Sequence, residues 1–147
     1  MTMGFKDRFV LKVRRGWKRH SIRKGNRWRV GMRVDAYEKP RQKGMNLILR
    51  APVTKVQHIE IVGLYFAGIR LSGLKVTIDG HTLDAAEMHQ FFRADGFNDG
   101  TEGAIKFWAK DLHEGDFIGQ VVHWNWNRRE FWKARRRPRR HYRRKKK

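Results

Sequence analysis

Apolar and polar residues alternate along several short stretches of this chain, which is the pattern of half-buried β-strands. The alternation predicts strands over residues 5–13, 28–35, 47–53, 56–62 and 117–126, and a further strand or a buried hairpin over residues 69–78. Pro52 confines the third of these strands to a sheet edge or a bulge, because proline has no N–H to donate to a neighbouring strand. Gly31 weakens the second strand, and Asp79-Gly80 is a turn signal.

The clearest helical signal begins at Asp84. Asp84 at the N-cap and Glu87 three residues later have the spacing of a capping box, and apolar side chains then follow at helical spacing, at Met88, Phe91 and Phe92. Gly96 ends this helix. A shorter helix is predicted over residues 104–112. Several short strands with one or two helices indicate an α+β domain built around a small, partly closed sheet.

Composition is compatible with one folded domain. The chain has 147 residues, of which 39% are hydrophobic and 12% aromatic, enough for a real core. Cysteine is absent, which excludes disulfides and thiolate metal sites. No run of about 18 apolar residues is present, so no transmembrane helix is expected. The N-terminus carries no apolar block typical of a signal peptide, and a cytoplasmic location is the default expectation.

The positive charge is concentrated at the two ends of the chain. The formal net charge is +21, with +11 in residues 1–33, −1 in residues 34–132 and +11 in residues 133–147. A small domain needs a net charge of only about 2–8 for solubility, so charge of this size points to a polyanionic partner. The segment 128–147 cannot form a core and is expected to be disordered. It lacks the apolar face of a membrane-binding helix, so no membrane partner is expected.

The densest local motif is the stretch GWKRHSIR, which contains Gly16, Lys18, Ser21 and Arg23. It resembles the Gly-x-Lys-x-x-(Glu/Ser/Thr)-x-Arg signature of ASCH domains, which are relatives of the PUA RNA-binding fold. The order of elements is also similar: a first strand, the signature, a glycine-containing strand, and a late helix that leads into Asp95-Gly96-Phe97. The resemblance covers residues 5–126.

This resemblance implies a small PUA-like β-barrel with one or two flanking helices and a cleft lined by the signature residues. It assigns residues 1–127 to an ASCH/PUA-like domain and leaves residues 128–147 as an Arg/Lys-rich tail. Members of the family are mostly read as RNA-binding. Some relatives hydrolyse the amide of acetylated cytidine, and at least one behaves as a ribonuclease. The hydrolases use a lysine, a threonine and a glutamate, which by motif correspond to Lys18, Ser21 and Glu87.

Each candidate site residue also has a simpler interpretation. Lys18 could act as a general base beside the Ser21 hydroxyl if burial lowers its pKa, but Lys18 and Arg23 could instead belong to a solvated basic stretch, with Ser21 merely in a turn. Arg23 could hold a phosphate through two parallel hydrogen bonds. Glu87 could be a catalytic acid, yet the capping box already explains a glutamate at that position.

The predicted nucleic-acid contacts come from both basic segments. Trp17 and Trp132 are the candidates for stacking on bases because each lies among cationic residues, whereas Trp28 is expected in the core. The phosphate and base contacts are predicted to be Trp17, Lys18, Arg19, His20, Arg23, Lys24, Arg27, Arg29, Arg135, Arg136, Arg137, Arg139, Arg140, Arg143 and Arg144. No histidine has metal-site spacing, so neither a metal nor another cofactor is predicted.

Three function classes remain open at this level. The first is an RNA-binding protein, with DNA as a possible alternative partner. The second is a ribonuclease or a nucleoside amidohydrolase acting through Lys18, Ser21 and Glu87. The third is an accessory protein that docks on a ribonucleoprotein or on an acidic protein. The motif supplies a family, and a family does not by itself fix a reaction.

Overall fold

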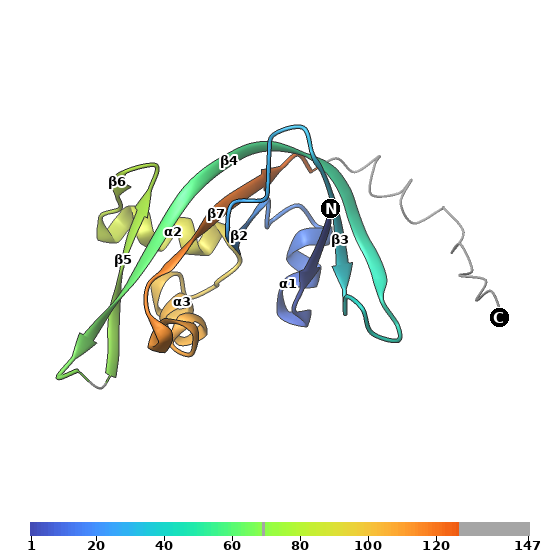
Figure 1. The fold of residues 1–147 in the computed structure, drawn as a ribbon. Helices are drawn as coiled ribbons and strands as arrows, with labels where there is room; N and C mark the ends of the chain where they lie inside the picture. The colour runs from blue at the N-terminus through green and yellow to red at the C-terminus, as the bar shows by residue number, and fades with distance from the viewer. Residues whose placement is uncertain (69, 127–147) are drawn as a thin grey trace, which may run out of the picture.

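The computed structural model describes residues 1–68 and 70–126 of the chain, which form an α+β fold as predicted (Figure 1). The strands are β1 (Thr2–Phe5), β2 (His20–Lys24), β3 (Arg33–Glu38), β4 (Asn46–Phe66), β5 (Arg70–Ile78), β6 (His81–Thr82) and β7 (Phe117–Trp124). The helices are α1 (Asp7–Arg14), α2 (Ala85–Ala94), α3 (Thr101–Trp108) and the short 3₁₀ helix η1 (Asp111–Glu114). The predicted tail, with Trp132 and the seven tail arginines named above, lies outside the described residues.

One long strand, β4, organises the sheet and forms the arch at the top of Figure 1. Its first part, residues 46–52, pairs with β3, whereas residues 53–61 pair with β7 and residues 59–66 with β5. The two strands predicted over residues 47–53 and 56–62 are therefore one strand of 21 residues. The register shifts between Val53 and Lys55, directly after Pro52. The bulge expected near this proline thus marks the point where β4 changes partners.

The sheet is open, and the predicted barrel is wrong. One path through the sheet runs β1-β3-β4-β5-β6, while β2 pairs with β7 and β7 with β4. Within the described residues, β1, β2 and β6 each pair with a single neighbour. A closed barrel needs every strand to have two neighbours, so the ends of this sheet stay apart. Figure 1 shows the helices beneath the arch of β4.

The first predicted strand, over residues 5–13, is instead the end of β1 followed by helix α1. The alternation of Phe9, Leu11 and Val13 suggested a strand, but Leu11 is 50% exposed while Val10 is buried with Phe9 and Val13. Burial at positions 9, 10 and 13 is helical spacing. The helix also has an acid in its first turn and bases in its last turn, as the helix dipole favours.

The second predicted strand is displaced toward the C-terminus. β3 covers Arg33–Glu38 rather than residues 28–35, because Gly31 takes a positive φ of 88° and turns the chain just before the strand. Trp28 is buried as expected, at 4% exposure. Its backbone N–H and carbonyl are both bonded by the side-chain amide of Gln120 on β7, at 3.0 and 3.2 Å. This paired amide fixes a segment that has no strand of its own.

The later elements agree closely with the sequence pattern. Helix α2 begins at the predicted capping box, in which the Glu87 N–H donates to Asp84 Oδ1 at 2.8 Å and the Asp84 N–H donates to Glu87 Oε1 at 3.2 Å. Strands β5 and β7 fall within the predicted ranges 69–78 and 117–126. The helix predicted over residues 104–112 is divided into α3 and η1. Local signals were therefore sufficient for most of the second half of the fold.

The helices pack against one another through aromatic side chains. Phe9 of α1, Phe97 after α2 and Phe107 of α3 meet edge to face, with ring centroids 5.4–6.0 Å apart. Gly96 has a positive φ of 108°, and an added Cβ would lie 2.8 Å from the Phe9 ring. Among the described residues, no helix has the length and apolar character needed to cross a membrane.

Candidate functional site

A pocket of about 180 Å³ lies where β1 and β2 meet the helices. Lys18, Ser21 and Arg23, the three signature side chains, all line it. The remaining polar side chains at the pocket belong to Lys6 and Asp95. Its walls are mainly aromatic, formed by Phe5, Phe9, Phe97, Phe107 and Trp108. The structure therefore gathers cationic groups and flat apolar surfaces around one small space.

The spacing of the signature follows from the local backbone. Gly16 takes a positive φ of 73° just after α1, and the amides of the next two residues both donate to the Lys12 carbonyl, at 2.9 and 3.0 Å. Ser21 and Arg23 then lie two positions apart on β2, so their side chains leave the same face of the strand. A glycine turn followed by a strand thus delivers the lysine, the serine and the arginine to one side.

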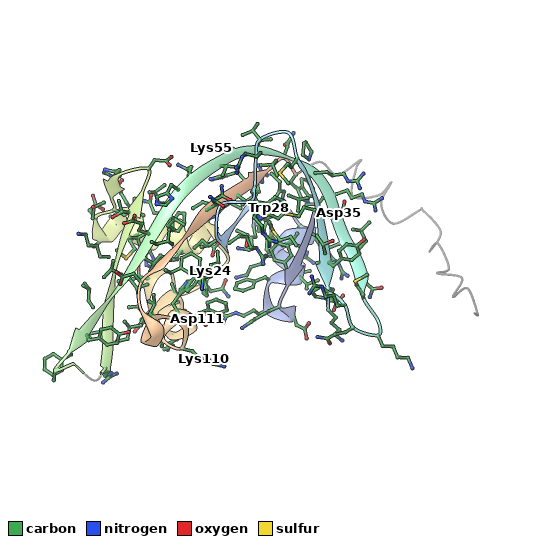
Figure 2. The ribbon with its side chains drawn as sticks, in the orientation of Figure 1. Lys24, Trp28, Asp35, Lys55, Lys110 and Asp111 are labelled. Atoms are coloured by element: carbon green, nitrogen blue, oxygen red, sulfur yellow. The ribbon has the colours of Figure 1, made fainter. Side chains whose placement is uncertain are left out.

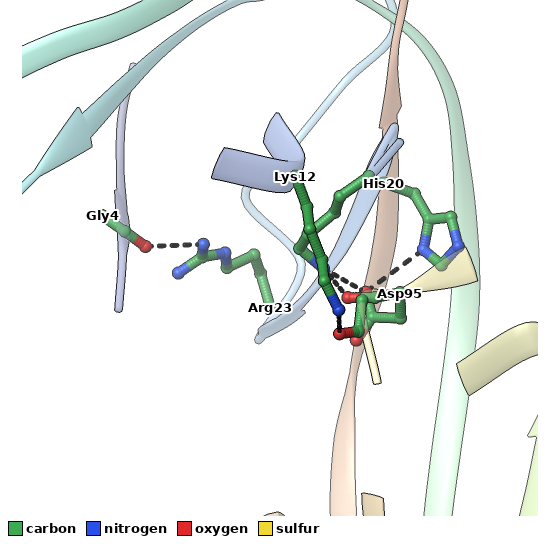
Figure 3. A network of polar contacts seen from close by, with 7 residues as sticks. Gly4, Lys12, His20, Arg23 and Asp95 are labelled. Carbon is green, nitrogen blue, oxygen red and sulfur yellow. Dashed lines mark hydrogen bonds and ion pairs between the residues drawn. The ribbon is translucent and has the colours of Figure 1, made fainter. Parts of the chain in front are cut away.

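Lys18 forms a buried ion pair with Asp95, the residue that caps the C-terminus of α2 (Figure 3). The Lys18 ammonium donates to Asp95 Oδ1 at 2.6 Å and also to the Asp95 carbonyl oxygen. His20 Nδ1 lies 3.4 Å from the same carboxylate oxygen, but it is not aligned for a hydrogen bond. The lysine of the signature is therefore fixed in place by the end of a helix far away in the sequence.

Burial and charge act in opposite directions on this pair. Burial lowers the Lys18 pKa, the charge and hydrogen bond of Asp95 raise it, and the net result is below the ordinary value of 10.5. Burial raises the Asp95 pKa, but the Lys18 charge and the nearby His20 outweigh it, so the pKa lies below 3.8. Asp95 is consequently ionised at neutral pH.

The pocket has more hydrogen-bond donors than its own residues use. The Lys18 ammonium has three N–H donors, and Asp95 takes two of them. Arg23 donates to the Gly4 carbonyl at 2.8 Å, while its buried Nε has no partner in the described part of the chain. The same holds for the buried Trp108 Nε1. Because the Asp95 carboxylate is already engaged, the pocket favours a ligand rich in acceptor oxygens or negative charge.

Arg23 remains cationic despite its burial. Burial lowers its pKa to about 10, and the negative charge of Asp95 partly opposes that shift. The guanidinium lies 5.0 Å from the centre of the Phe5 ring, which supports it from one side. At neutral pH this group supplies a positive charge between two aromatic walls.

Glu87 does not reach the pocket. Its carboxylate accepts the Asp84 N–H in the capping box, and His81 Nε2 lies 3.0 Å from Glu87 Oε2. The carboxylate that meets Lys18 is Asp95, which the sequence marked only as part of the Asp95-Gly96-Phe97 landmark. Sequence reasoning also missed Lys12, whose ammonium donates to the Gly96 carbonyl and to Asn98 Oδ1, the latter at 2.7 Å. Lys12 thereby holds the loop after α2 against α1.

The other predicted contacts are divided between surface and interior. Trp17 is 60% exposed, with the Arg15 guanidinium 5.1 Å from the centre of its ring. Arg19, Lys24, Arg27 and Arg29 are exposed, and Figure 2 shows Lys24 beneath the β4 arch. His20 is 7% exposed and stacks on Phe91, so it is part of the interior. The exposed group supplies a basic surface, whereas His20 supports the buried ion pair.

The described residues contain no group of three or more His, Cys, Asp or Glu side chains placed to hold a metal ion. Comparisons of this chain with protein-family models, with curated proteins and with solved structures give no match. The pocket and the charge distribution of the chain itself are therefore the features that indicate what it binds.

Proposed function

We propose that this chain is an RNA-binding protein whose pocket holds one nucleotide of a single strand. The observation that carries the proposal is the convergence of Lys18, Ser21 and Arg23 on a pocket with unused donors and aromatic walls. Nucleotides match this chemistry, because they combine a flat base that stacks on aromatic rings with phosphate and carbonyl oxygens that accept hydrogen bonds. The resemblance to ASCH domains supports the same conclusion.

The pocket volume suits part of one nucleotide, such as its base, rather than a larger ligand. At about 180 Å³, it is smaller than the roughly 300–1,000 Å³ of sites that take drug-sized molecules. The basic segments would supply phosphate contacts outside the pocket. If six to ten phosphates are engaged in total, affinity should fall about 10³–10⁵-fold between 50 and 200 mM salt.

The test is the affinity of the full chain for random-sequence single-stranded RNA, measured by fluorescence anisotropy across a salt series. Ser21→Ala should weaken binding about two- to tenfold, the equivalent of one hydrogen bond of about 0.5–1.5 kcal/mol. Arg23→Lys keeps the charge but loses the fork of donors, and should weaken binding as well. Both changes spare the Lys18–Asp95 pair, and a thermal unfolding curve confirms that each variant is folded.

Two controls complete this experiment. Deletion of residues 133–147 should flatten the salt dependence, and an unchanged slope would remove that segment from the proposal. Single-stranded DNA of the same length tests the choice of nucleic acid, because the 2′-hydroxyl is what distinguishes RNA at a given site. Equal affinity for both would replace RNA by single-stranded nucleic acid in general, and absence of binding in dilute buffer would overturn the proposal.

A hydrolase is the second candidate, and the buried Lys18–Asp95 pair beside the Ser21 hydroxyl favours it. A lysine with a lowered pKa, a hydroxyl and a carboxylate in one pocket are the groups that an amide or phosphodiester hydrolase requires. In this version Asp95 takes the role that the sequence gave to Glu87. Acetylated cytidine and RNA should then be turned over by the wild type, with a large loss in Ser21→Ala. If neither substrate is turned over, the hydrolase candidate is wrong and only the RNA-binding proposal remains.

A further inference from the structure

A second and wider cavity, of about 810 Å³, adjoins the pocket and shares Gly4, Phe5, Lys6 and Arg23 with it. Its other lining residues come from the start of α1 and from the loop between β3 and β4. The shared residues place the small pocket directly beside a groove between these two segments. We call this wider cavity the β1–α1 groove.

The β1–α1 groove is strongly basic. Lys6, Arg8, Arg23 and Lys39 line it, and Asp7 is its one carboxylate. Lys6, Arg8 and Lys39 are exposed, and none forms an ion pair with a carboxylate within the described residues. Their positive charges are therefore available to a ligand.

Aromatic rings restrain two of these cations. The Lys6 ammonium lies 4.6 Å from the centre of the Phe107 ring, and the Arg8 guanidinium lies 5.1 Å from that of Phe9. Both rings also line the small pocket. The same aromatic cluster thus forms the wall of the pocket and supports the cations at its mouth.

Gly4 brings the two sides of the groove together. Its carbonyl accepts a hydrogen bond from Arg23 at 2.8 Å, and a Cβ at this position would lie 2.3 Å from Pro40 Cγ. The absence of a side chain lets the β3–β4 loop pack directly on β1. Lys39, next to Pro40, thereby lines the same groove as Lys6.

We propose that the β1–α1 groove binds the backbone phosphates of the RNA strand that continues from the nucleotide held in the pocket. This inference rests on the proposed function and extends it, because it gives the strand a path: Arg23 at the junction, then Lys6, Arg8 and Lys39. The groove has the open, basic character of a channel that follows a sugar-phosphate backbone, and it shares four lining residues with the pocket that takes the base.

The experiment compares the full chain with the double variant Arg8→Gln/Lys39→Gln, at two residues that line the groove but not the pocket, in binding random-sequence single-stranded RNA at several salt concentrations. Each phosphate contact to a single strand contributes about 0.7 to the slope of log affinity against log salt. Loss of two contacts should lower the magnitude of the slope by about 1.4. If the variant and the wild type bind equally at 1 M salt, the variant should then bind about 25-fold more weakly than the wild type at 0.1 M salt. The affinity for a nucleoside monophosphate should change far less, because the pocket is intact.

The matched control is Lys55→Gln/Lys75→Gln, which removes the same charge from two exposed lysines that line neither cavity. Figure 2 shows Lys55 on the outer side of the β4 arch. If the groove variant and this control lose the same small affinity, the groove inference is wrong while the proposed function stands. If the wild type itself does not bind RNA, both fail. A larger slope change in the groove variant supports the inference.

Discussion

Lys18 and Asp95 form an ion pair at 2.6 Å between two side chains that are only 3% and 7% exposed. The partners come from opposite halves of the chain, and the pair joins the start of β2 to the end of α2. Removing one partner from a buried pair leaves an uncompensated charge, which costs about 3–5 kcal/mol. The pair therefore fixes the position of Lys18 in the pocket, and loss of either partner alone would destabilise the fold.

We expect Asp95→Ala to lower the free energy of unfolding by about 3–5 kcal/mol, because it leaves the Lys18 ammonium buried without a counter-charge. Urea denaturation measures this change. The matched control is the double variant Lys18→Met/Asp95→Leu, which removes both charges and should recover much of the loss, since apolar replacements of a buried pair are often neutral. A double variant less stable than Asp95→Ala would contradict this explanation.

The stability of the protein should fall as the pH drops from about 6.5 to about 4, through the titration of His123. Burial lowers the His123 pKa from 6.5 to about 4, and the charges of His20 and Lys55 contribute. Between these values the unfolded chain binds more protons than the folded chain, so protonation favours unfolding. Measured by urea denaturation across this range, His123→Gln should show a shallower decline than the wild type.

Asp95 provides the control for that experiment. Its pKa is lowered below 3.8 in the folded state, so its contribution to stability is present above pH 3.8 and is lost as the pH falls further. Asp95→Asn should therefore make the decline below pH 3.8 shallower, with the remainder due to groups such as Asp84, whose pKa is also lowered, and should leave the decline between 6.5 and 4 in place. Identical pH profiles for His123→Gln and the wild type would show that His123 does not cause the upper decline.

Gly16→Ala should destabilise the protein more than Gly25→Ala does. Both glycines have a positive φ, of 73° and 84°, where an L side chain costs about 1–2 kcal/mol. An added Cβ at Gly16 would also lie 2.6 Å from the Trp126 ring, whereas nothing lies within 4 Å at Gly25. Gly25→Ala isolates the backbone strain, and the difference between the two variants measures the displacement of Trp126. If urea denaturation gives the same loss of unfolding free energy for both variants, displacement of the Trp126 ring does not destabilise the protein.

Trp17→Ala should separate binding from stability. Trp17 is 60% exposed, so its removal should change the unfolding free energy by less than about 0.5 kcal/mol. If its ring stacks on a base, RNA affinity should fall by about 1–3 kcal/mol. Trp28→Ala is the contrasting variant, because Trp28 is buried and its loss should cost about 3–5 kcal/mol of stability. Unchanged RNA affinity in Trp17→Ala would show that the bound RNA does not stack on Trp17.

Local physics explains which features the sequence could predict. The capping box of Asp84 and Glu87 fixes the start of α2 within four residues, so no distant contact was needed to place it. Ser21 and Arg23 share a face because they alternate on β2, but the charge-rich sequence around them did not predict that strand. The concentration of positive charge at the two ends of the chain is a property of composition alone.

The features that were predicted wrongly depend on partners distant in the sequence. Residues 5–13 carry an apolar pattern compatible with a strand or a helix. The packing of Phe9 against Phe97 and Phe107 favours the helix. β4 is one strand because two different neighbours bond its two parts. The sheet stays open because its edge strands lack second neighbours, which no pattern within a single strand encodes.

The sequence by itself determined the α+β class, the helix at Asp84, the charge at the two ends and the residues Lys18, Ser21 and Arg23 as a candidate cluster. Only the tertiary structure decided that Asp95, rather than Glu87, pairs with Lys18, and that the pocket adjoins a basic groove. The physical reason is separation along the chain: Lys18 and Asp95 are 77 residues apart. Local propensity acts over a few residues, whereas burial of an ion pair depends on how distant segments pack.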